Sequence, residues 1–199
     1  RGFSFRFDSD LDMRFDKTKG MSASEVLNSF DESELADIFY KYGEERQSRI
    51  IAKSIVDSRP IKTTFDLTKI ISNSKRKSKS KINPSTKVFQ ALRIYVNQEL
   101  RNVEKGLEEA LKLLKFGGHF SVISYHSLED RIVKNFFKKN SLDCICSPSI
   151  IECQCQHSAL IRRINKKVIQ PTEKEINNNP RSRSAKLRIV QRIPISEQV

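Results

Sequence analysis

The sequence predicts an α/β fold that combines a block of helices with part of a sheet. Between residues 21 and 84, four short segments carry apolar residues at helical spacing. From residue 85 onward the chain reads as a long helix, a short apolar strand and a second helix, followed by short strand-like segments. We therefore expect the later part to form the back half of an α/β sheet, and the helical block to be an insertion into it or a separate lobe.

The predicted helical block has clear start signals. Residues 1–20 alternate phenylalanine with charged residues and are expected to form an ordered loop or a short strand. The sequence from Ser22 to Glu25 is a capping-box pattern that opens the first helix. A second helix is expected to begin at Asp31 and to be interrupted at Gly43.

The third and fourth helices follow directly. Residues 44–59 are expected to form the third, which ends at Pro60. Thr64 is expected to cap the fourth, and the basic segment Ser72–Lys81 to form an exposed loop that is either solvated or in contact with RNA phosphates. The apolar residues of the third helix expected to face inward are Ile50, Ile51, Ile55 and Val56.

The later part is predicted from the same kinds of pattern. Apolar residues recur every three or four positions from Ser85 to Lys115, so we expect one long helix, terminated by the glycines at 117–118. His119–Tyr125 is expected to be a buried strand, and Ser127 with Asp130 to cap the next helix. Further expected elements are strands at Val168–Ile169 and Lys186–Ile193, and a capped turn of helix at Thr172–Glu175.

The composition points to an acidic partner. The chain has 37 lysines and arginines against 24 acidic residues, a formal net charge of +13. Nucleic acid is the commonest partner of such a surface, because lysine and arginine displace counterions from phosphates. No run approaches the roughly 18 apolar residues of a membrane span, and no secretory signal pattern is present. A cytoplasmic protein without a membrane partner is expected.

The first candidate site lies where the predicted strand ends. Ligands of open α/β sheets bind beyond the carboxyl ends of the strands, where Tyr125, His126, Ser127, Glu129 and Asp130 stand. The start of the following helix also offers free backbone N–H groups to a phosphate or carboxylate. Alternatively, these residues only cap the helix and satisfy its backbone.

Three other clusters are candidates. Asp12 and Arg14, within the acidic run "DSDLDMRFD", suit either a substrate pocket or a structural salt-bridge cluster. Arg181 and Arg183 precede Lys186 and Arg188 in an alternating pattern, which predicts one basic strand face for phosphates, unless the charges are only solvated.

The last cluster is a cysteine-rich loop at residues 144–157. Cys144, Cys146, Cys153 and Cys155 have the spacing C-x-C-x₆-C-x-C. Tetrahedral zinc prefers four soft ligands, although the usual spacing is wider. Reduced free thiols are the alternative in an intracellular protein, and disulfides are less expected.

Taken together, the motifs resemble the RsmH/MraW family of S-adenosylmethionine-dependent methyltransferases. The matching stretches are "RGFSF", "LDMR" (11–14), "YGEER" (42–46), "FQALRIYVN" (89–97), "GGHFSVISYHSLEDRIVK" (117–134) and "NPRSRSAKLR" (179–188). They run in the family's order over nearly the whole chain. The sequence departs from the usual family pattern at residues 8–10, at 83–87 and at Tyr125, where phenylalanine is usual.

The resemblance implies methylation of the N4 amine of a cytidine in 16S ribosomal RNA, with the small ribosomal subunit as partner and S-adenosylmethionine as cofactor. It implies a partial class I (Rossmann-like) methyltransferase sheet. Residues 1–20 would continue the catalytic domain, 21–84 would be an inserted all-helical domain, and 85–199 would be the C-terminal part of the methyltransferase domain.

The roles of individual residues in such a methyl transfer are expectations. Tyr125, His126 and Ser127 are the catalytic candidates, while Asp12, Arg14, Arg181 and Arg183 are the substrate-binding candidates. The family's cofactor-binding motifs precede "RGFSF", so we expect the chain to be a fragment that holds none of them and is inactive alone. Two other functions stay open: a non-catalytic RNA-binding module, and a zinc-stabilised interaction domain built on the four cysteines.

Overall fold

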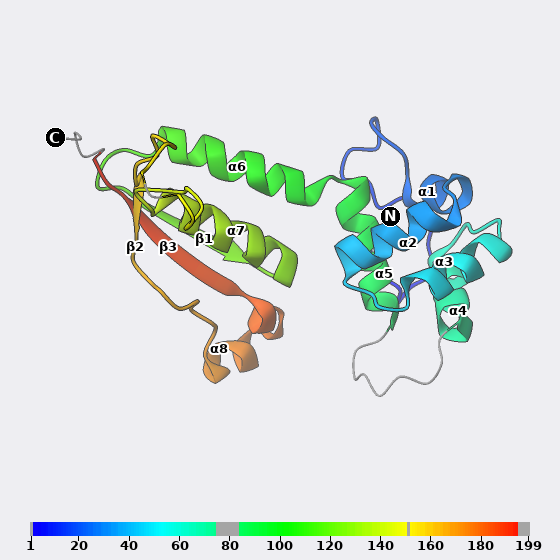
Figure 1. The fold of residues 1–199 in the computed structure, drawn as a ribbon. Coiled ribbons are helices and arrows are strands. Elements are labelled where there is room, and N and C mark those ends of the chain that lie inside the picture. Colours follow the sequence, from blue (N-terminus) through cyan, green and yellow to red (C-terminus); the bar gives the residue numbers. More distant parts are fainter. Residues whose placement is uncertain (1, 75–83, 151, 195–199) are drawn as a thin grey trace. The chain divides into compact units, whose positions relative to one another are not determined.

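A computed structural model of the chain describes residues 2–74, 84–150 and 152–194. The chain divides into two compact units, Arg1–Glu99 and Leu100–Val199, and each is described by itself (Figure 1). The division follows Glu99, whereas the predicted domain boundary follows residue 84. That the helices of the first unit are an insertion into a larger sheet stays a prediction.

The described residues of the first unit form five helices around one apolar core. The predicted capping box from Ser22 to Glu25 is confirmed, and the second helix starts at Asp31 as expected, where Asp31 forms a reciprocal capping box with Glu34. The core contains buried apolar residues from all five helices together with Leu11 and Met13. The helices are α1 (Ala23–Ser29), α2 (Glu32–Gly43), α3 (Ser48–Asp57), α4 (Thr64–Ser74) and α5 (Pro84–Val96).

Gly43 has a packing role as well as the predicted terminating one. It is the last residue of α2, and Glu44 after it adopts the left-handed conformation that stops the helix. A Cβ atom at Gly43 would lie 2.6 Å from the carbonyl oxygen of Lys87 on α5. The close approach of α2 and α5 therefore requires glycine at this position.

Three local predictions in this unit are wrong. Helix α3 begins at Ser48 rather than residue 44, and Ile50 is 50% exposed. Ile51 and Ile55 share the buried face because they are four residues apart, whereas Ile50 points about 100° away from Ile51. Thr63, not Thr64, caps α4.

The cap of α4 leaves Thr64 for another contact. The Thr63 hydroxyl accepts the backbone N–H of Asp66 at 3.3 Å, and the Asp66 carboxylate accepts the N–H of Thr63 at 3.0 Å. The Thr64 hydroxyl instead donates to the Phe7 carbonyl at 2.8 Å. Ser72–Ser74 of the predicted basic loop form the end of α4, and the remainder of that loop lies outside the described residues.

The predicted single helix at 85–115 is two helices. Helix α5 ends at Val96 and α6 runs from Glu99 to Leu113. Gln98 between them has a φ of +50°, which cannot continue a right-handed helix. The Asn97 side chain fixes this break by binding the Met13 carbonyl and the Phe15 amide, contacts that the helical pattern does not reveal.

The second unit is a three-stranded sheet with helices packed on one face. Strands β1 (His119–Ser124), β3 (Lys186–Arg192) and β2 (Ile161–Arg163) lie in the order β1-β3-β2, and both pairs are antiparallel. Helix α7 (Ser127–Asn140) packs on the sheet together with the apolar face of α6 (Figure 1). Their shared core consists of Leu107, Leu111, Val133, Phe137, Ile161 and Val190.

The prediction of a buried strand at 119–125 is wrong. Phe120, Val122 and Ser124 face the helices, but the alternate residues His119, Ser121 and Ile123 are exposed, so only one face is covered. The described sheet is antiparallel, whereas the rule that ligands bind beyond the strand ends applies to open, mostly parallel sheets.

The C-terminal elements follow the predictions with two changes. Thr172 caps α8 (Glu173–Asn178) as predicted, and a 3₁₀ helix, η1, covers Pro180–Ser184 before β3. The predicted strand at Val168–Ile169 is a single bridge from Ile169 to Leu187, while β2 was not predicted. None of the described helices combines the length and apolar character that crossing a membrane requires.

Candidate functional site

Tyr125, His126 and Ser127 join the end of β1 to the start of α7. His126 is the N-cap of α7: its Nδ1 accepts the backbone N–H of Glu129 at 3.3 Å. Glu129 in turn accepts the backbone N–H of Tyr125 at 2.9 Å and that of His126 at 3.4 Å. The predicted cap, Ser127 with Asp130, is therefore wrong by one residue, and Ser127 is the first residue of the helix.

The capping geometry limits what His126 can do chemically. Because Nδ1 accepts a hydrogen bond, the proton of the neutral ring is assigned to Nε2. Nε2 lies 3.3 Å from a Glu129 carboxylate oxygen, in ion-pair range but outside hydrogen-bond geometry. Burial raises the pKa of Glu129, but the adjacent His126 ring and the backbone amides of Tyr125 and His126 outweigh burial and lower it overall. Tyr125, by contrast, is 55% exposed, and Ser127 is also exposed.

Asp12 and Arg14 form a close ion pair in the first unit. Arg14 Nε donates to Asp12 Oδ1 at 2.7 Å, and Arg14 Nη1 donates to the Gly20 carbonyl at 3.1 Å. The hydrogen bond from Arg14 lowers the pKa of Asp12. Met13 between them is fully buried with a φ of +59°. This geometry fits a structural salt-bridge cluster, one of the two alternatives left open by the sequence, and a role in substrate binding stays a prediction.

Arg181 and Arg183 lie in η1 and are exposed. They do not continue into one basic strand face with Lys186 and Arg188, as the alternating pattern predicted. Arg188 makes two hydrogen bonds to Asp130 on α7, of 2.7 and 3.1 Å, and Lys186 lies 3.5 Å from the same carboxylate.

The sheet register brings two predicted groups to the same end of the second unit. Ser124, the last residue of β1, pairs with Lys186, the first residue of β3. Residues 125–127 come directly after Ser124, and η1 comes shortly before Lys186. The exposed Tyr125 ring and hydroxyl of Ser127 therefore share one sheet end with Arg181 and Arg183.

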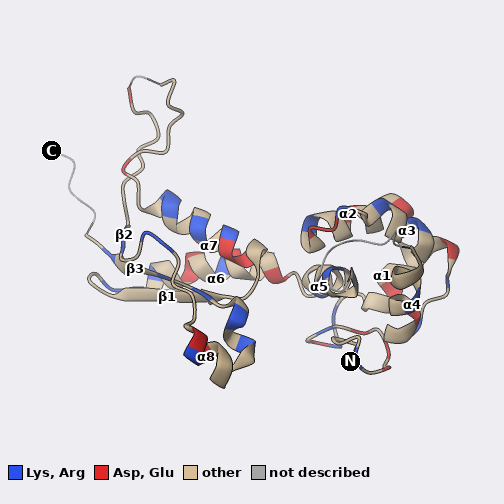
Figure 2. Cartoon of the chain, turned by 90° about the horizontal axis from the view of Figure 1, so that it is seen from below, with Lys and Arg blue, Asp and Glu red and all other residues tan. Residues whose placement is uncertain are grey.

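Basic side chains are also present along the exposed side of α7. Figure 2 shows Lys and Arg along this helix, and Lys134, Lys138 and Lys139 are exposed. A surface of this kind can neutralise phosphates without reading sequence.

The four cysteines meet in the loop between α7 and β2. Their sulfur atoms all lie within 4.8 Å of one another, and none is in a disulfide. The backbone N–H groups of Ile145 and His157 lower the pKa of the Cys155 thiol to about 6. The backbone N–H of Cys146 lowers the pKa of Cys144, but hydrogen bonds among the thiols outweigh that effect and raise the pKa of Cys144 to about 12. The predicted proximity of the four thiols is thus present in the folded chain.

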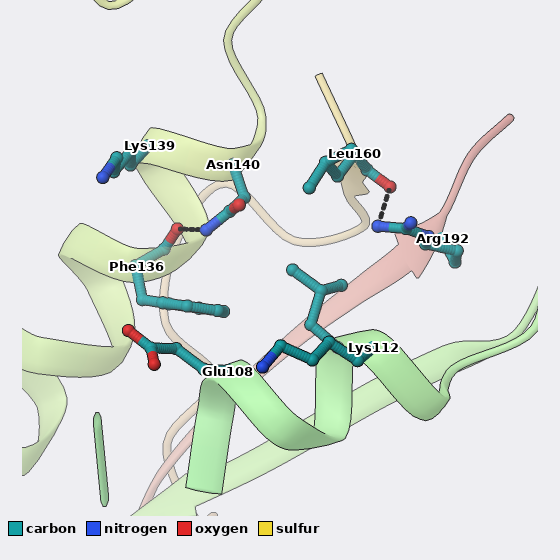
Figure 3. Close-up of a pocket in the computed structure, with 8 residues that line it drawn as sticks. Glu108, Lys112, Phe136, Lys139, Asn140, Leu160 and Arg192 are labelled. Atoms are coloured by element: carbon teal, nitrogen blue, oxygen red, sulfur yellow. Dashed lines mark hydrogen bonds between the residues drawn. The ribbon is translucent and has the colours of Figure 1, made fainter. Parts of the chain in front are cut away.

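One pocket in the second unit was not anticipated (Figure 3). It has a volume of about 290 Å³ and lies between α6, the end of α7 and the end of β3. Leu111, Phe136 and Leu160 form its apolar part, and Glu108, Lys112, Lys139, Asn140 and Arg192 its polar part. These residues come from distant positions on separate elements, so no local motif could have predicted them.

Comparison with known proteins places the chain in a class of methylases. Residues 1–193 match the MraW methylase family, and the chain belongs to that family. This confirms the resemblance noted from the motifs. Membership in this family implies a Rossmann-like fold, of which the described chain contributes a small three-stranded sheet.

Several curated relatives carry the name ribosomal RNA small subunit methyltransferase H. The chain is 48% identical over 192 residues to the protein of Dehalococcoides mccartyi, a match covering 96% of this chain and 55% of the relative. It is 48% identical over 201 residues to that of Acaryochloris marina, covering 100% of this chain and 61% of the relative. It is 47% identical over 196 residues to the protein of Caldicellulosiruptor saccharolyticus, a match covering 97% of this chain and 64% of the relative. The chain thus spans between 55% and 64% of the length of these relatives.

Proposed function

We propose that this chain is part of an enzyme that methylates the N4 amine of a cytidine in small-subunit ribosomal RNA, in the cytoplasm. The family match over residues 1–193 supports methyl transfer, and the names of the relatives support ribosomal RNA as the substrate. The observation that carries the assignment of residues is the shared sheet end formed by Tyr125–Ser127 and η1.

The chain's part in the reaction is to hold the RNA. A base must leave its stack to be modified, and unstacked bases are commonly held on aromatic rings. Tyr125 offers such a ring, and the guanidinium groups of Arg181 and Arg183 suit the flanking phosphates. The net charge of +13 favours association with RNA over the whole surface.

His126 is a positioning residue in this proposal. Its Nδ1 is occupied by the Glu129 amide, so it is not placed to take the proton that the N4 amine loses. It fixes the start of α7 and hence the direction of the neighbouring Tyr125 and Ser127. Holding the amine in line with the methyl donor is the main leverage available, because its lone pair is delocalised into the cytosine ring.

S-adenosylmethionine supplies an electrophilic methyl group when it is bound to such an enzyme. Glycine-rich turns after a strand form the usual cradle of a nucleotide cofactor. Among the described residues no such turn follows a strand, and the pair Gly117–Gly118 precedes β1. The described residues do not fit the main cofactor site, and we assign none of them to it.

Asp12 and Arg14 belong to the proposed substrate-binding set with a narrower role. Their ion pair and the bond to Gly20 stiffen residues 12–20. An ordered segment of this kind binds substrate at lower entropic cost than a mobile one.

The test uses a chimera in which this chain replaces the matching 192 residues of the Dehalococcoides mccartyi relative. The chimera and the chain alone are incubated with small ribosomal subunits and S-adenosylmethionine carrying a tritiated methyl group. We expect label in the RNA with the chimera and none with the chain alone. A folded chimera that binds the methyl donor but transfers no label contradicts the proposal.

A non-catalytic RNA-binding module is the second candidate, favoured by the lack of a cofactor cradle among the described residues. It predicts that the chain alone binds small-subunit RNA and that the donor-binding chimera is inactive. Both candidates predict that the chain binds the RNA in a filter assay, so methyl transfer by the donor-binding chimera is the measurement that separates them.

A further inference from the structure

We propose that Cys144, Cys146, Cys153 and Cys155 form a structural zinc site that folds the loop between α7 and β2. The proposal does not depend on methyl transfer. It rests on the arrangement of the four sulfur atoms, on the hydrogen bonds they accept and on the make-up of the loop.

The sulfur separations match a tetrahedral tetrathiolate. Zinc–sulfur bonds of about 2.3 Å place the four sulfurs of a tetrahedron about 3.8 Å apart. The sulfurs of Cys144 and Cys155 lie 3.8 Å apart, and those of Cys153 and Cys155 lie 3.5 Å apart. All four lie within 4.8 Å of one another. Two pairs separated by one residue thus converge on one point.

Backbone amides already surround these sulfurs. The N–H of Ile145 donates to Cys155, that of Cys146 to Cys144, and that of Gln154 to Cys146, each at 3.4 Å. Such outer hydrogen bonds orient ligands and stabilise the negative charge of thiolates around a metal. Three of the four sulfurs therefore already accept a backbone hydrogen bond of the kind found around metal-bound thiolates.

His157 is not one of the ligands. Its Nε2 makes a 3.0 Å hydrogen bond with the Lys139 carbonyl at the end of α7. This bond fixes the ring at the base of the loop. The site is therefore assigned four cysteines rather than three cysteines and a histidine.

The loop needs a cross-link because little else holds it. Between α7 and β2 it contains no helix or strand in its described residues, and Figure 2 shows it extending away from the sheet. Its base is closed by the bond from the Leu160 amide to the Asn140 carbonyl, at 2.9 Å. Beyond this base Ile145 and Ile150 are more than 40% exposed, so the described residues of the loop form no apolar core. Loops longer than about 12–15 residues without secondary structure are uncommon in compact domains, and a metal can replace the missing core.

The experiment measures metal in the whole chain, purified in the presence of zinc and without chelator. We expect one equivalent of zinc per chain. Replacement by Co²⁺ should give the strong visible bands and the sulfur-to-cobalt charge transfer of a tetrahedral tetrathiolate. The variants Cys144→Ser, Cys146→Ser, Cys153→Ser and Cys155→Ser should each lose or shift this spectrum, and His157→Ala should keep it.

A second readout follows the loop itself. Limited proteolysis should cut residues 141–160 rapidly after chelation and slowly in the zinc-bound chain, with His157→Ala protected like the unaltered chain. The proposal is overturned if the chain binds no more zinc than a variant lacking all four cysteines. It is also overturned if thiol titration before reduction finds the cysteines paired in disulfides, or if His157→Ala loses the metal.

Discussion

At the scale of single residues, Asp130 is a buried acidic residue on the α7 face that packs on the sheet. It is 8% exposed and accepts two hydrogen bonds from Arg188 across the helix–sheet contact. Asp130→Asn removes the negative charge that pairs with Arg188 and leaves the guanidinium group without its ion-pair partner. Breaking a buried pair costs roughly 3–5 kcal/mol, and we expect the lower end, measured as the free energy of unfolding in urea. Glu109→Gln is the matched control, because its pair with Lys112 is exposed to solvent and should contribute little to stability.

The same carboxylate predicts how stability depends on pH. The hydrogen bond from Arg188 lowers the pKa of Asp130 below its ordinary value of 3.8. Its contribution is therefore fully present above that unfolded-state value and is lost as the pH falls through the lower folded-state pKa. Urea unfolding measured from pH 6 to pH 2 should show less loss of stability in Asp130→Asn than in the unaltered chain. Equal losses in both proteins would remove Asp130 from this account.

His126 allows its structural and chemical roles to be separated. Asparagine is a good N-cap and alanine is a poor one, with a difference of about 1 kcal/mol. We expect His126→Ala to destabilise α7 and reduce methyl transfer by the chimera, and His126→Asn to restore both. Hydrogen exchange of the α7 amides and the initial rate of transfer are the two measurements. A stable His126→Asn chimera without activity would mean that the imidazole takes part in the reaction.

At the scale of elements, Asn97 holds the break between α5 and α6. Its side chain donates to the Met13 and Arg93 carbonyls and accepts the Phe15 amide, at 2.7 to 2.9 Å. Asn97→Ala should destabilise the first unit by about 3 kcal/mol, since each of the three lost bonds contributes about 1 kcal/mol. Faster hydrogen exchange at residues 11–16 and in α5 is the readout. Asn140→Ala, which loses one bond within its own helix, should have a smaller effect.

The elements also show what a sequence can and cannot predict. Capping boxes at Ser22 and Asp31 were predictable because every participating atom lies within four residues. The break at Gln98 was not, because it depends on contacts between Asn97 and a segment more than 80 residues away. The apolar run at 119–125 predicted a strand correctly, but periodicity did not reveal which faces are covered. β2 has only three residues, too few for any pattern.

The candidate site likewise contains features that the sequence could predict and features that it could not. Motifs identified Tyr125–Ser127, the arginines of η1 and the four cysteines, since each group is local in sequence. The pairing of Arg188 with Asp130 and the pocket around Arg192 join residues from distant positions and required the folded chain.

At the scale of the whole molecule, net charge predicts strongly salt-dependent RNA binding. The logarithm of the binding constant should fall linearly with the logarithm of salt concentration. Replacing both Arg181 and Arg183 by alanine should reduce the magnitude of that slope by about 1.4, since each single-strand phosphate contact contributes about 0.7. Arg49→Ala with Lys53→Ala on α3 is the charge-matched control. Equal changes in both double variants would show that η1 has no special contact with the RNA.

The most direct test of the central claim identifies the methylated atom. Small-subunit RNA treated with the chimera and S-adenosylmethionine is digested to nucleosides and analysed by mass spectrometry against methylcytidine standards. The account predicts N4-methylcytidine, absent from RNA treated with the chain alone. A methyl group on another atom, or none from a folded chimera that binds the donor, would contradict it.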